Sequence, residues 1–93
     1  MYCVYILLSE KLDRFYIGST SDFNIRMIFH HNPEARKYTA KAKDWRLFDK
    51  IDCQSKSQAL AIEKHIKSMK SKTYIKNLNQ YPEMKEKLKV RFK

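Results

Sequence analysis

The chain of 93 residues contains one glycine, two prolines and two cysteines, and it has no long apolar run. So few Cys and His residues, at unsuitable spacings, exclude a disulfide-dense scaffold and a structural zinc site. No segment approaches the roughly 18 apolar residues that a membrane helix needs. The first residues also lack the basic region and small-residue cleavage site of a secretory signal. We therefore expect a cytoplasmic protein without a membrane segment. Its thiols, Cys3 and Cys53, are expected to serve as small apolar residues, with a disulfide left open.

Acidic residues are scarce relative to basic ones. Twenty Lys and Arg stand against ten Asp and Glu, which gives a formal net charge of +10. This excess favours a polyanionic partner, of which nucleic acid is the commonest, although a lysine-rich surface also serves solubility alone. The hydrophobic fraction of 43% suffices for a folded core. At this length we expect residues 1–93 to form a single domain.

The apolar patterning predicts an α+β fold. Strands are expected over 2–8, 14–18 and 45–53, the first two as a hairpin. Helices are expected over four segments, the first capped by Ser21 or Asp22 and ending at His31, the others at 55–70, 71–80 and 82–90. The longest helix carries an apolar stripe of Ala59, Ile62, Ile66 and Met69. This element order predicts a small three-stranded, mainly antiparallel sheet flanked by helices, with a C-terminal helix.

The single glycine, Gly18, ends a short aromatic and β-branched run that includes Tyr16. Glycine supplies either a positive φ or a backbone without a side chain. Tyr5 lies in the preceding predicted strand. Two strands that each carry a tyrosine, with a bare backbone where the second meets a helix, are a candidate site for handling phosphate. Each tyrosine taken alone is equally typical of a core-filling aromatic residue.

Two residues of the following helix suggest the same chemistry. Arg26 and His30 are four positions apart, so they lie on one helix face. The guanidinium fork of Arg matches phosphate geometry, and imidazole exchanges protons near neutral pH. For each residue alone, a solvated charge or a surface imidazole is the simpler interpretation.

Glu63 lies at the edge of the apolar stripe of the long helix. It is placed either to form an i,i+4 ion pair with Lys67 or to hold a divalent cation, which Mg²⁺ sites achieve with one or two carboxylates. The basic segment with Lys37, Tyr38 and Lys41 combines aromatic and cationic side chains. That composition is typical of contacts with nucleic acid.

Together these residues resemble the GIY-YIG nuclease superfamily over nearly the whole chain. The first motif is present as Cys3-Val4-Tyr5 and the second as Tyr16-Ile17-Gly18. Arg26, His30 and Glu63 match further positions of the family pattern. The chain is most similar to its small single-domain branch, and so to the N-terminal nuclease domain of the bacterial excision-repair incision subunit. That likeness suggests a role in DNA repair.

The resemblance implies a metal-dependent endonuclease that hydrolyses phosphodiester bonds in DNA with little intrinsic sequence specificity. It implies one Mg²⁺ or Mn²⁺ ion, held by Glu63. Arg26 would neutralise charge on the reacting phosphate, and Tyr5 would help to deprotonate the attacking water. Tyr16 and His30 would position the phosphate or the nucleophile.

The same resemblance implies which residues contact nucleic acid, with DNA favoured over RNA. They are Gly18, whose bare backbone would let DNA pass, together with Ser19, Lys37, Tyr38 and Lys41. The family often carries an asparagine after the glutamate, and Asn77 and Asn79 are both open candidates for that position. The alternative function is a non-catalytic nucleic-acid-binding module on the same fold. We expect a monomer, and a protein partner for targeting remains open.

Overall fold

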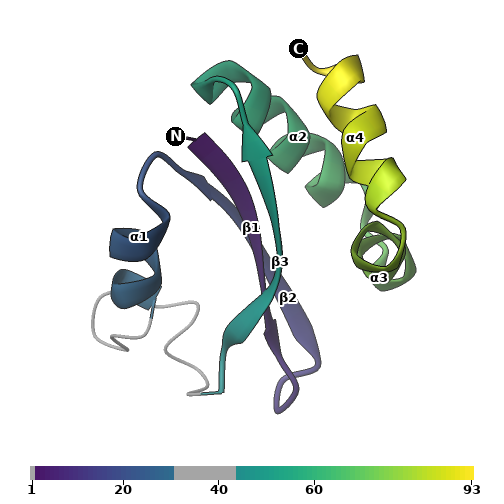
Figure 1. Ribbon diagram of the computed structural model, residues 1–93. Coiled ribbons are helices and arrows are strands. Elements are labelled where there is room, and N and C mark those ends of the chain that lie inside the picture. The colour runs from purple at the N-terminus through teal and green to yellow at the C-terminus, as the bar shows by residue number, and fades with distance from the viewer. Residues whose placement is uncertain (1, 31–43) are drawn as a thin grey trace.

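The computed structural model describes residues 2–30 and 44–93, with the side chains of residues 28–30 outside that description. The elements in chain order are β1 (Tyr2–Ser9), β2 (Arg14–Thr20), α1 (Phe23–His30), β3 (Arg46–Cys53), α2 (Lys56–Met69), α3 (Lys72–Gln80) and α4 (Pro82–Arg91). The strands form one antiparallel sheet in the order β2-β1-β3. Helix α1 lies on one side of this sheet and α2, α3 and α4 lie on the other (Figure 1). The predicted α+β class and element order are confirmed.

Strand β2 is longer than the sequence predicts. It continues through Ser19 and Thr20, which pair with Val4 and Cys3 of β1. The polar cluster after Gly18 was expected to begin the helix, but backbone pairing with β1 keeps it extended. The helix cap is Asp22, whose Oδ1 accepts a hydrogen bond from the Ile25 amide at 3.1 Å. The described part of α1 ends at His30, and His31 lies outside the described residues.

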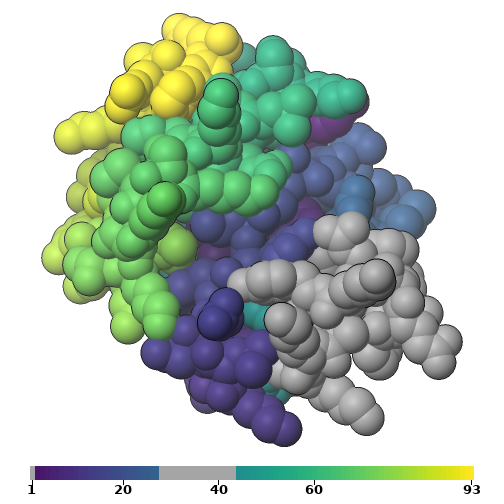
Figure 2. All heavy atoms as spheres, turned by 180° about the vertical axis from the view of Figure 1, so that it is seen from behind, coloured from purple at the N-terminus to yellow at the C-terminus, as the bar shows by residue number. Residues whose placement is uncertain are grey.

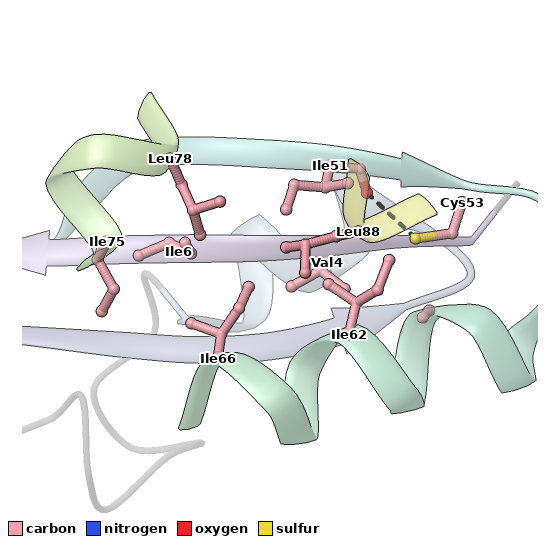
Figure 3. Close-up of a cluster of buried hydrophobic side chains, with 10 residues drawn as sticks. Val4, Ile6, Ile51, Cys53, Ile62, Ile66, Ile75, Leu78 and Leu88 are labelled. Carbon is pink, nitrogen blue, oxygen red and sulfur yellow. Dashed lines mark hydrogen bonds between the residues drawn. The ribbon is translucent and has the colours of Figure 1, made fainter. Parts of the chain in front are cut away.

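The main core lies between the sheet and the helices α2–α4. Because side chains alternate along a strand, β1 directs Val4 and Ile6 to this face and Tyr5 and Leu7 to the other. Val4 and Ile6 meet Ile62 of α2 in one continuous apolar cluster, which also takes in side chains from β3, α3 and α4 (Figure 3). Helix α2 is thereby fixed against β1 and β2.

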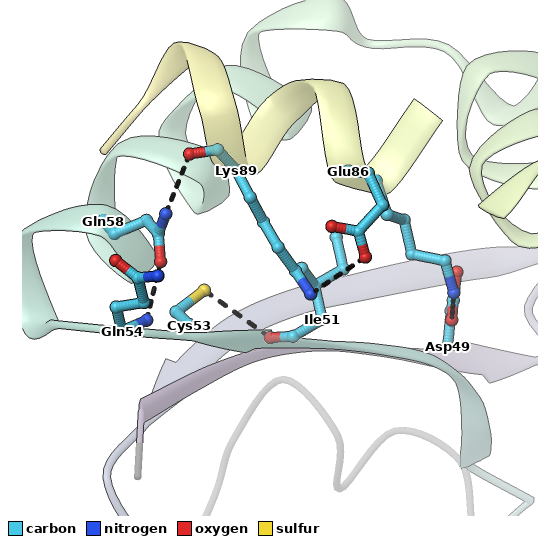
Figure 4. Close-up of polar contacts among 8 residues, drawn as sticks. Asp49, Ile51, Cys53, Gln54, Gln58, Glu86 and Lys89 are labelled. Atoms are coloured by element: carbon cyan, nitrogen blue, oxygen red, sulfur yellow. Dashed lines mark hydrogen bonds and ion pairs between the residues drawn. The ribbon is translucent and has the colours of Figure 1, made fainter. Parts of the chain in front are cut away.

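One residue expected inside is exposed, and one polar residue takes a core position. Met69 is 43% exposed, because α2 turns it away from the sheet at its last residue. Gln58, in contrast, is buried. Its Oε1 accepts from the Gln54 amide at 2.6 Å and its Nε2 donates to the Lys89 carbonyl at 3.0 Å (Figure 4). These bonds satisfy its amide, which makes its burial tolerable.

Helix α4 is attached to the rest of the fold by apolar and polar contacts. Leu88 is buried in the main core, and Lys85 Nζ forms an ion pair with Asp49 Oδ1 of β3 at 2.7 Å. This pair lies on the α4 side of the sheet (Figure 4). Since both side chains are largely buried, removing one of them would leave an uncompensated charge. The C-terminal helix therefore packs on its own chain.

Helix α2 ends at a strained residue. Lys70 adopts the left-handed conformation, with φ 47° and ψ 42°, where glycine is the favoured residue. We expect Lys70→Gly to raise the free energy of unfolding by about 0.5–1 kcal/mol, measured by urea denaturation. Lys64, an exposed residue in the interior of the same helix, is the control. Lys64→Gly should have the opposite effect and lower the free energy of unfolding by about 1 kcal/mol. A fall in stability for Lys70→Gly would contradict the left-handed conformation of residue 70.

A second, smaller apolar cluster occupies the α1 face of the sheet. It consists of the buried residues Tyr5, Leu7 and Trp45, with Tyr16 and Met27 packed against them. Helix α1 is held on this face through such contacts, which places Arg26 near the C-terminal end of β2.

Both cysteines are free thiols inside the sheet. Cys3 and Cys53 are buried and unbridged. Burial raises the pKa of each thiol. They therefore stay protonated and unreactive at neutral pH, in agreement with an apolar role.

Candidate active site

The two motif tyrosines form one aromatic cluster on the α1 face of the sheet. Tyr5 on β1 and Tyr16 on β2 have ring centroids 6.4 Å apart at an angle of 23°. The ring of Trp45 meets Tyr16 edge-on, with centroids 6.5 Å apart. Tyr5 is only 1% exposed, whereas Tyr16 is half-buried. Of the two rings, Tyr16 is thus the one nearer to solvent.

Gly18 makes room for the Tyr5 ring. The two residues are paired across β1 and β2, and the φ angle of Gly18 is not positive. A Cβ atom on Gly18 would lie 2.5 Å from Cζ of Tyr5 and closer still to its hydroxyl oxygen. The family glycine therefore accommodates an internal aromatic ring. The expectation that its bare backbone lets nucleic acid pass is a separate one and stays a prediction.

Arg26 lies where three elements meet. Its side chain, on the second turn of α1, lines a cavity of about 280 Å³ together with Ser19 of β2 and Lys56 and Leu60 of α2. It also lines a neighbouring cavity of about 340 Å³ formed by the turn between β2 and α1. Arg26 is thus a half-buried residue at the junction of β2, α1 and the first turns of α2.

Glu63 follows Leu60 by about one turn on α2. Its side chain is 17% exposed, and its Oε2 accepts an ion-paired hydrogen bond from Lys67 Nζ at 2.6 Å. The residues Lys56, Leu60, Glu63 and Lys67 share one stripe of the helix, at spacings of three and four. The stripe that lines the Arg26 cavity therefore continues directly to the Glu63 carboxylate.

One cation on the tyrosine face was not identified from the sequence. Lys50 of β3 pairs with Tyr5 across the sheet, so it shares the Tyr5 face. Its Nζ lies 4.6 Å from the centroid of the Phe23 ring and 3.4 Å from Oδ1 of Asp52. The alternation of apolar and polar residues along β3 could have shown that Lys50 lies on the face opposite the main core. It could not have shown that Lys50 lies opposite Tyr5, because this register depends on the pairing of two strands that are far apart in sequence.

The structure brings part of the predicted set together. Tyr5 and Tyr16 contact each other, while Arg26 and Ser19 line one cavity that adjoins the α2 stripe. Glu63 is on the helix that covers the opposite face from the tyrosines, in the stripe that runs along β2. The side chain of His30 and all of Lys37, Tyr38 and Lys41 lie outside the described residues. Asn79 donates to the Phe48 carbonyl at 3.2 Å, which is a structural contact between α3 and β3.

The side chains of the described residues suit a metal ion that takes few of its ligands from the protein. Among residues 2–30 and 44–93, no three His, Cys, Asp or Glu side chains form a cluster that could hold a metal ion. Glu63 is a single, partly buried carboxylate one helical turn beyond Leu60, which lines the Arg26 cavity. Mg²⁺ is commonly held by one or two carboxylates, with water and substrate phosphate as the other ligands. A lone Glu63 is compatible with that kind of ion.

A family model described as the GIY-YIG catalytic domain matches residues 1–81. The chain therefore belongs to the GIY-YIG family, which consists of endonucleases that generally use divalent metal ions. This confirms the resemblance and assigns the chain a nuclease-type function with a nucleic acid substrate. No curated protein and no solved structure gives a significant match. Within the described residues, none of the helices has the length and apolar composition to cross a membrane.

Proposed function

We propose that this protein is a metal-dependent endonuclease that hydrolyses phosphodiester bonds in DNA with little intrinsic sequence specificity. One Mg²⁺ or Mn²⁺ ion, held by Glu63, would serve the reaction. The proposal depends chiefly on one observation: Arg26 shares a cavity with Ser19 and with the α2 stripe that continues to Glu63. A guanidinium at this cavity and a carboxylate one turn further along the same helix stripe suit a phosphate and a cation, respectively.

Each residue has a distinct role in this proposal. Arg26 binds the reacting phosphate and stabilises the negative charge that develops on it. Helix α2, which carries Glu63, packs along β2, the edge strand that carries Tyr16. Because Tyr16 is also more exposed than Tyr5, we assign the orientation and deprotonation of water to Tyr16. Tyr5 supports the Tyr16 ring from behind, which reverses the division of labour implied by the family resemblance. A bound divalent cation supplies charge neutralisation at the phosphate and makes water more acidic.

In this proposal, basic side chains near the site hold the substrate through its phosphate backbone. Arg26 and Lys56 line the Arg26 cavity, and Lys50 lies on the tyrosine face. We infer that these cationic side chains contact phosphates of the substrate. Contacts of this kind are directed at the backbone, so affinity should fall steeply with salt concentration. We also propose that residues 1–93 act as one monomeric nuclease domain, since Leu88 of α4, beyond the matched residues, is part of the main core. A cytoplasmic location and a role in DNA repair belong to the same proposal.

A nicking assay on supercoiled plasmid tests the proposal. We expect conversion to open-circle and linear forms with Mg²⁺ or Mn²⁺ and none in EDTA. The preference for DNA is tested by comparing the cleavage rates of a single-stranded RNA and a DNA oligonucleotide of the same sequence. Cleavage that is unaffected by EDTA would exclude the metal-dependent mechanism.

The alternative is a non-catalytic module that binds nucleic acid. One observation favours it: Glu63 is already engaged by Lys67 at 2.6 Å, so a cation would have to displace this ammonium. Salt-sensitive DNA binding by the native protein, with no nicking at any Mg²⁺ or Mn²⁺ concentration, would establish the alternative.

The guanidinium fork of Arg26 can be tested separately from its charge. Arg26→Lys keeps the positive charge but loses the bidentate geometry that suits phosphate. We expect about a tenfold lower nicking rate, with a smaller effect on DNA affinity, because the charge on the phosphate grows during the reaction. Arg91→Lys, an exposed arginine on α4, is the control and should cleave normally. Equal rates for Arg26→Lys and the native protein would remove Arg26 from the mechanism.

A further inference from the structure

A second hollow of the described residues lies at the other end of β2 from Arg26. Its volume is about 450 Å³, and it is enclosed by the start of β2, the end of α2 and the start of α3. Its floor is apolar, formed by Phe15, Ile17, Ile66 and Ile75. Figure 2 shows this face, with β2 between the green helices α2 and α3 and the blue residues of α1. We call this hollow the β2–α3 cavity.

The rim of the β2–α3 cavity is strongly basic. It carries four cations, Arg14, Lys67, Lys70 and Lys72, against one carboxylate, Asp13. Lys72 Nζ bonds Asp13 Oδ2 at 2.8 Å, and Lys67 bonds Glu63. Within the described part of the chain, no carboxylate forms an ion pair with Arg14 or Lys70. Two positive charges are therefore available to an anion at the rim.

The backbone adds to this positive field. Helix α3 begins at the cavity, and Ser71, one of the lining residues, is its N-cap. The Ser71 side chain accepts from the Tyr74 amide at 3.1 Å, which leaves the first amides of the helix directed out of its N-terminal end. The helix macrodipole places partial positive charge at this end. Basic side chains and a helix N-terminus thus converge on one hollow above an apolar floor.

The cavity is linked to the proposed active site through Lys67 and Glu63. Lys67 both bonds Glu63 and lines the cavity, so the two regions share a residue. From Glu63 to Lys70 the helix advances seven residues, which corresponds to about 10 Å at 1.5 Å per residue. In a B-form strand that distance spans about three nucleotides of axial rise.

We propose that the β2–α3 cavity binds a backbone phosphate of the cleaved strand, about three nucleotides to one side of the scissile bond. This inference rests on the proposed function, since that function brings a polyanionic strand to Glu63. Arg14 and Lys70 contact the phosphate, and the apolar floor packs against the adjoining sugar. The second phosphate fixes the direction in which the strand crosses the active site.

The first test maps the phosphate on the substrate. The probe is an oligonucleotide duplex with one ordinary phosphodiester linkage in the cleaved strand. All other linkages of that strand are phosphorothioates, which keep the negative charge but are cleaved slowly, so cleavage is confined to one known position. A single neutral methylphosphonate is moved one linkage at a time to either side. We expect cleavage to fall about tenfold when the neutral linkage is about three nucleotides away on one side only. A flat profile, or a profile that is symmetric about the scissile bond, would overturn the inference.

The second test uses the variant Arg14→Gln/Lys70→Asn. Asn tolerates the left-handed conformation of residue 70, so the helix end should be preserved. The one-sided minimum should disappear in this variant. Lys87→Gln, at an exposed position of α4 outside the cavity, should leave the minimum in place. Loss of the minimum in both variants would show a general charge effect and would overturn the assignment.

A binding measurement separates this inference from the proposed function. Affinity of each protein for a DNA duplex is measured in EDTA at several salt concentrations, so no cleavage is needed. The slope of log affinity against log salt should fall by about one in Arg14→Gln/Lys70→Asn and stay unchanged in Lys87→Gln. If the native protein never cleaves but this slope changes, the phosphate site stands and the nuclease proposal fails. An unchanged slope overturns the phosphate site whether or not cleavage occurs.

Discussion

Glu63→Gln should lower the nicking rate at least a hundredfold while leaving the protein folded. The substitution removes the carboxylate to which the proposal assigns the divalent cation, and it keeps the size of the side chain. Weakening even an indirect partner of a metal commonly costs 10–100-fold, so the loss of a direct ligand should exceed that range. Single-turnover nicking of supercoiled plasmid at saturating Mn²⁺ measures the effect.

Stability is the necessary companion measurement for this variant. The bond between Glu63 and Lys67 is an i,i+4 pair with a half-exposed lysine, and such pairs contribute only about 0.3–0.5 kcal/mol. The melting temperature of Glu63→Gln should therefore stay within a few degrees of the native value. Glu86→Gln, on the exposed side of α4, is the matched control and should cleave at the native rate. Full activity in Glu63→Gln would mean that the cation, or the active site, lies elsewhere.

Gly18→Ala should destabilise the protein by about 3 kcal/mol, the upper end of the range for overpacking a core. The new methyl group would fall within 3.0 Å of the Tyr5 ring. That ring is fully buried on the α1 face of the sheet, with Tyr16 packed against it, so it has little freedom to move. For a domain of this size the melting temperature should drop by roughly 15 °C.

A double-mutant cycle identifies the cause of this loss. In a Tyr5→Leu background the ring is absent, and Gly18→Ala should cost much less than it does in the native protein. The free energy of unfolding of the four proteins, from urea denaturation, gives the coupling between the two positions. An equal cost in both backgrounds would show that the glycine is required for a reason other than the Tyr5 ring.

Several features of the fold could be predicted because they depend on neighbours in sequence. The predicted helix start at residue 55 is formed by a cap at Ser55, whose Oγ accepts from the Gln58 amide at 3.1 Å. Ser71 caps α3, and Pro82 begins α4, in the same local manner. These signals operate over three or four residues, so the pattern of residue types is sufficient to find them.

Burial at the ends of elements was less predictable. Met69 has the right spacing for the apolar stripe, yet it is exposed because α2 extends past the edge of the core. Gln58 has the wrong polarity for a core position, yet its amide is satisfied by the chain on both sides, one partner being the Lys89 carbonyl of α4. Both outcomes depend on where α2 and α4 end relative to the sheet, which periodicity does not encode.

By itself the sequence determined the element order, the helix caps and the motif residues that define the family. Only the tertiary structure decided that Gly18 faces the Tyr5 ring, that Lys50 lies opposite Tyr5, and that Arg14 and Lys70 border one basic cavity. The physical reason is the range of the interactions. Caps and amphipathic stripes form between residues a few positions apart, whereas strand register and cavity walls join segments that are distant along the chain and meet only after folding.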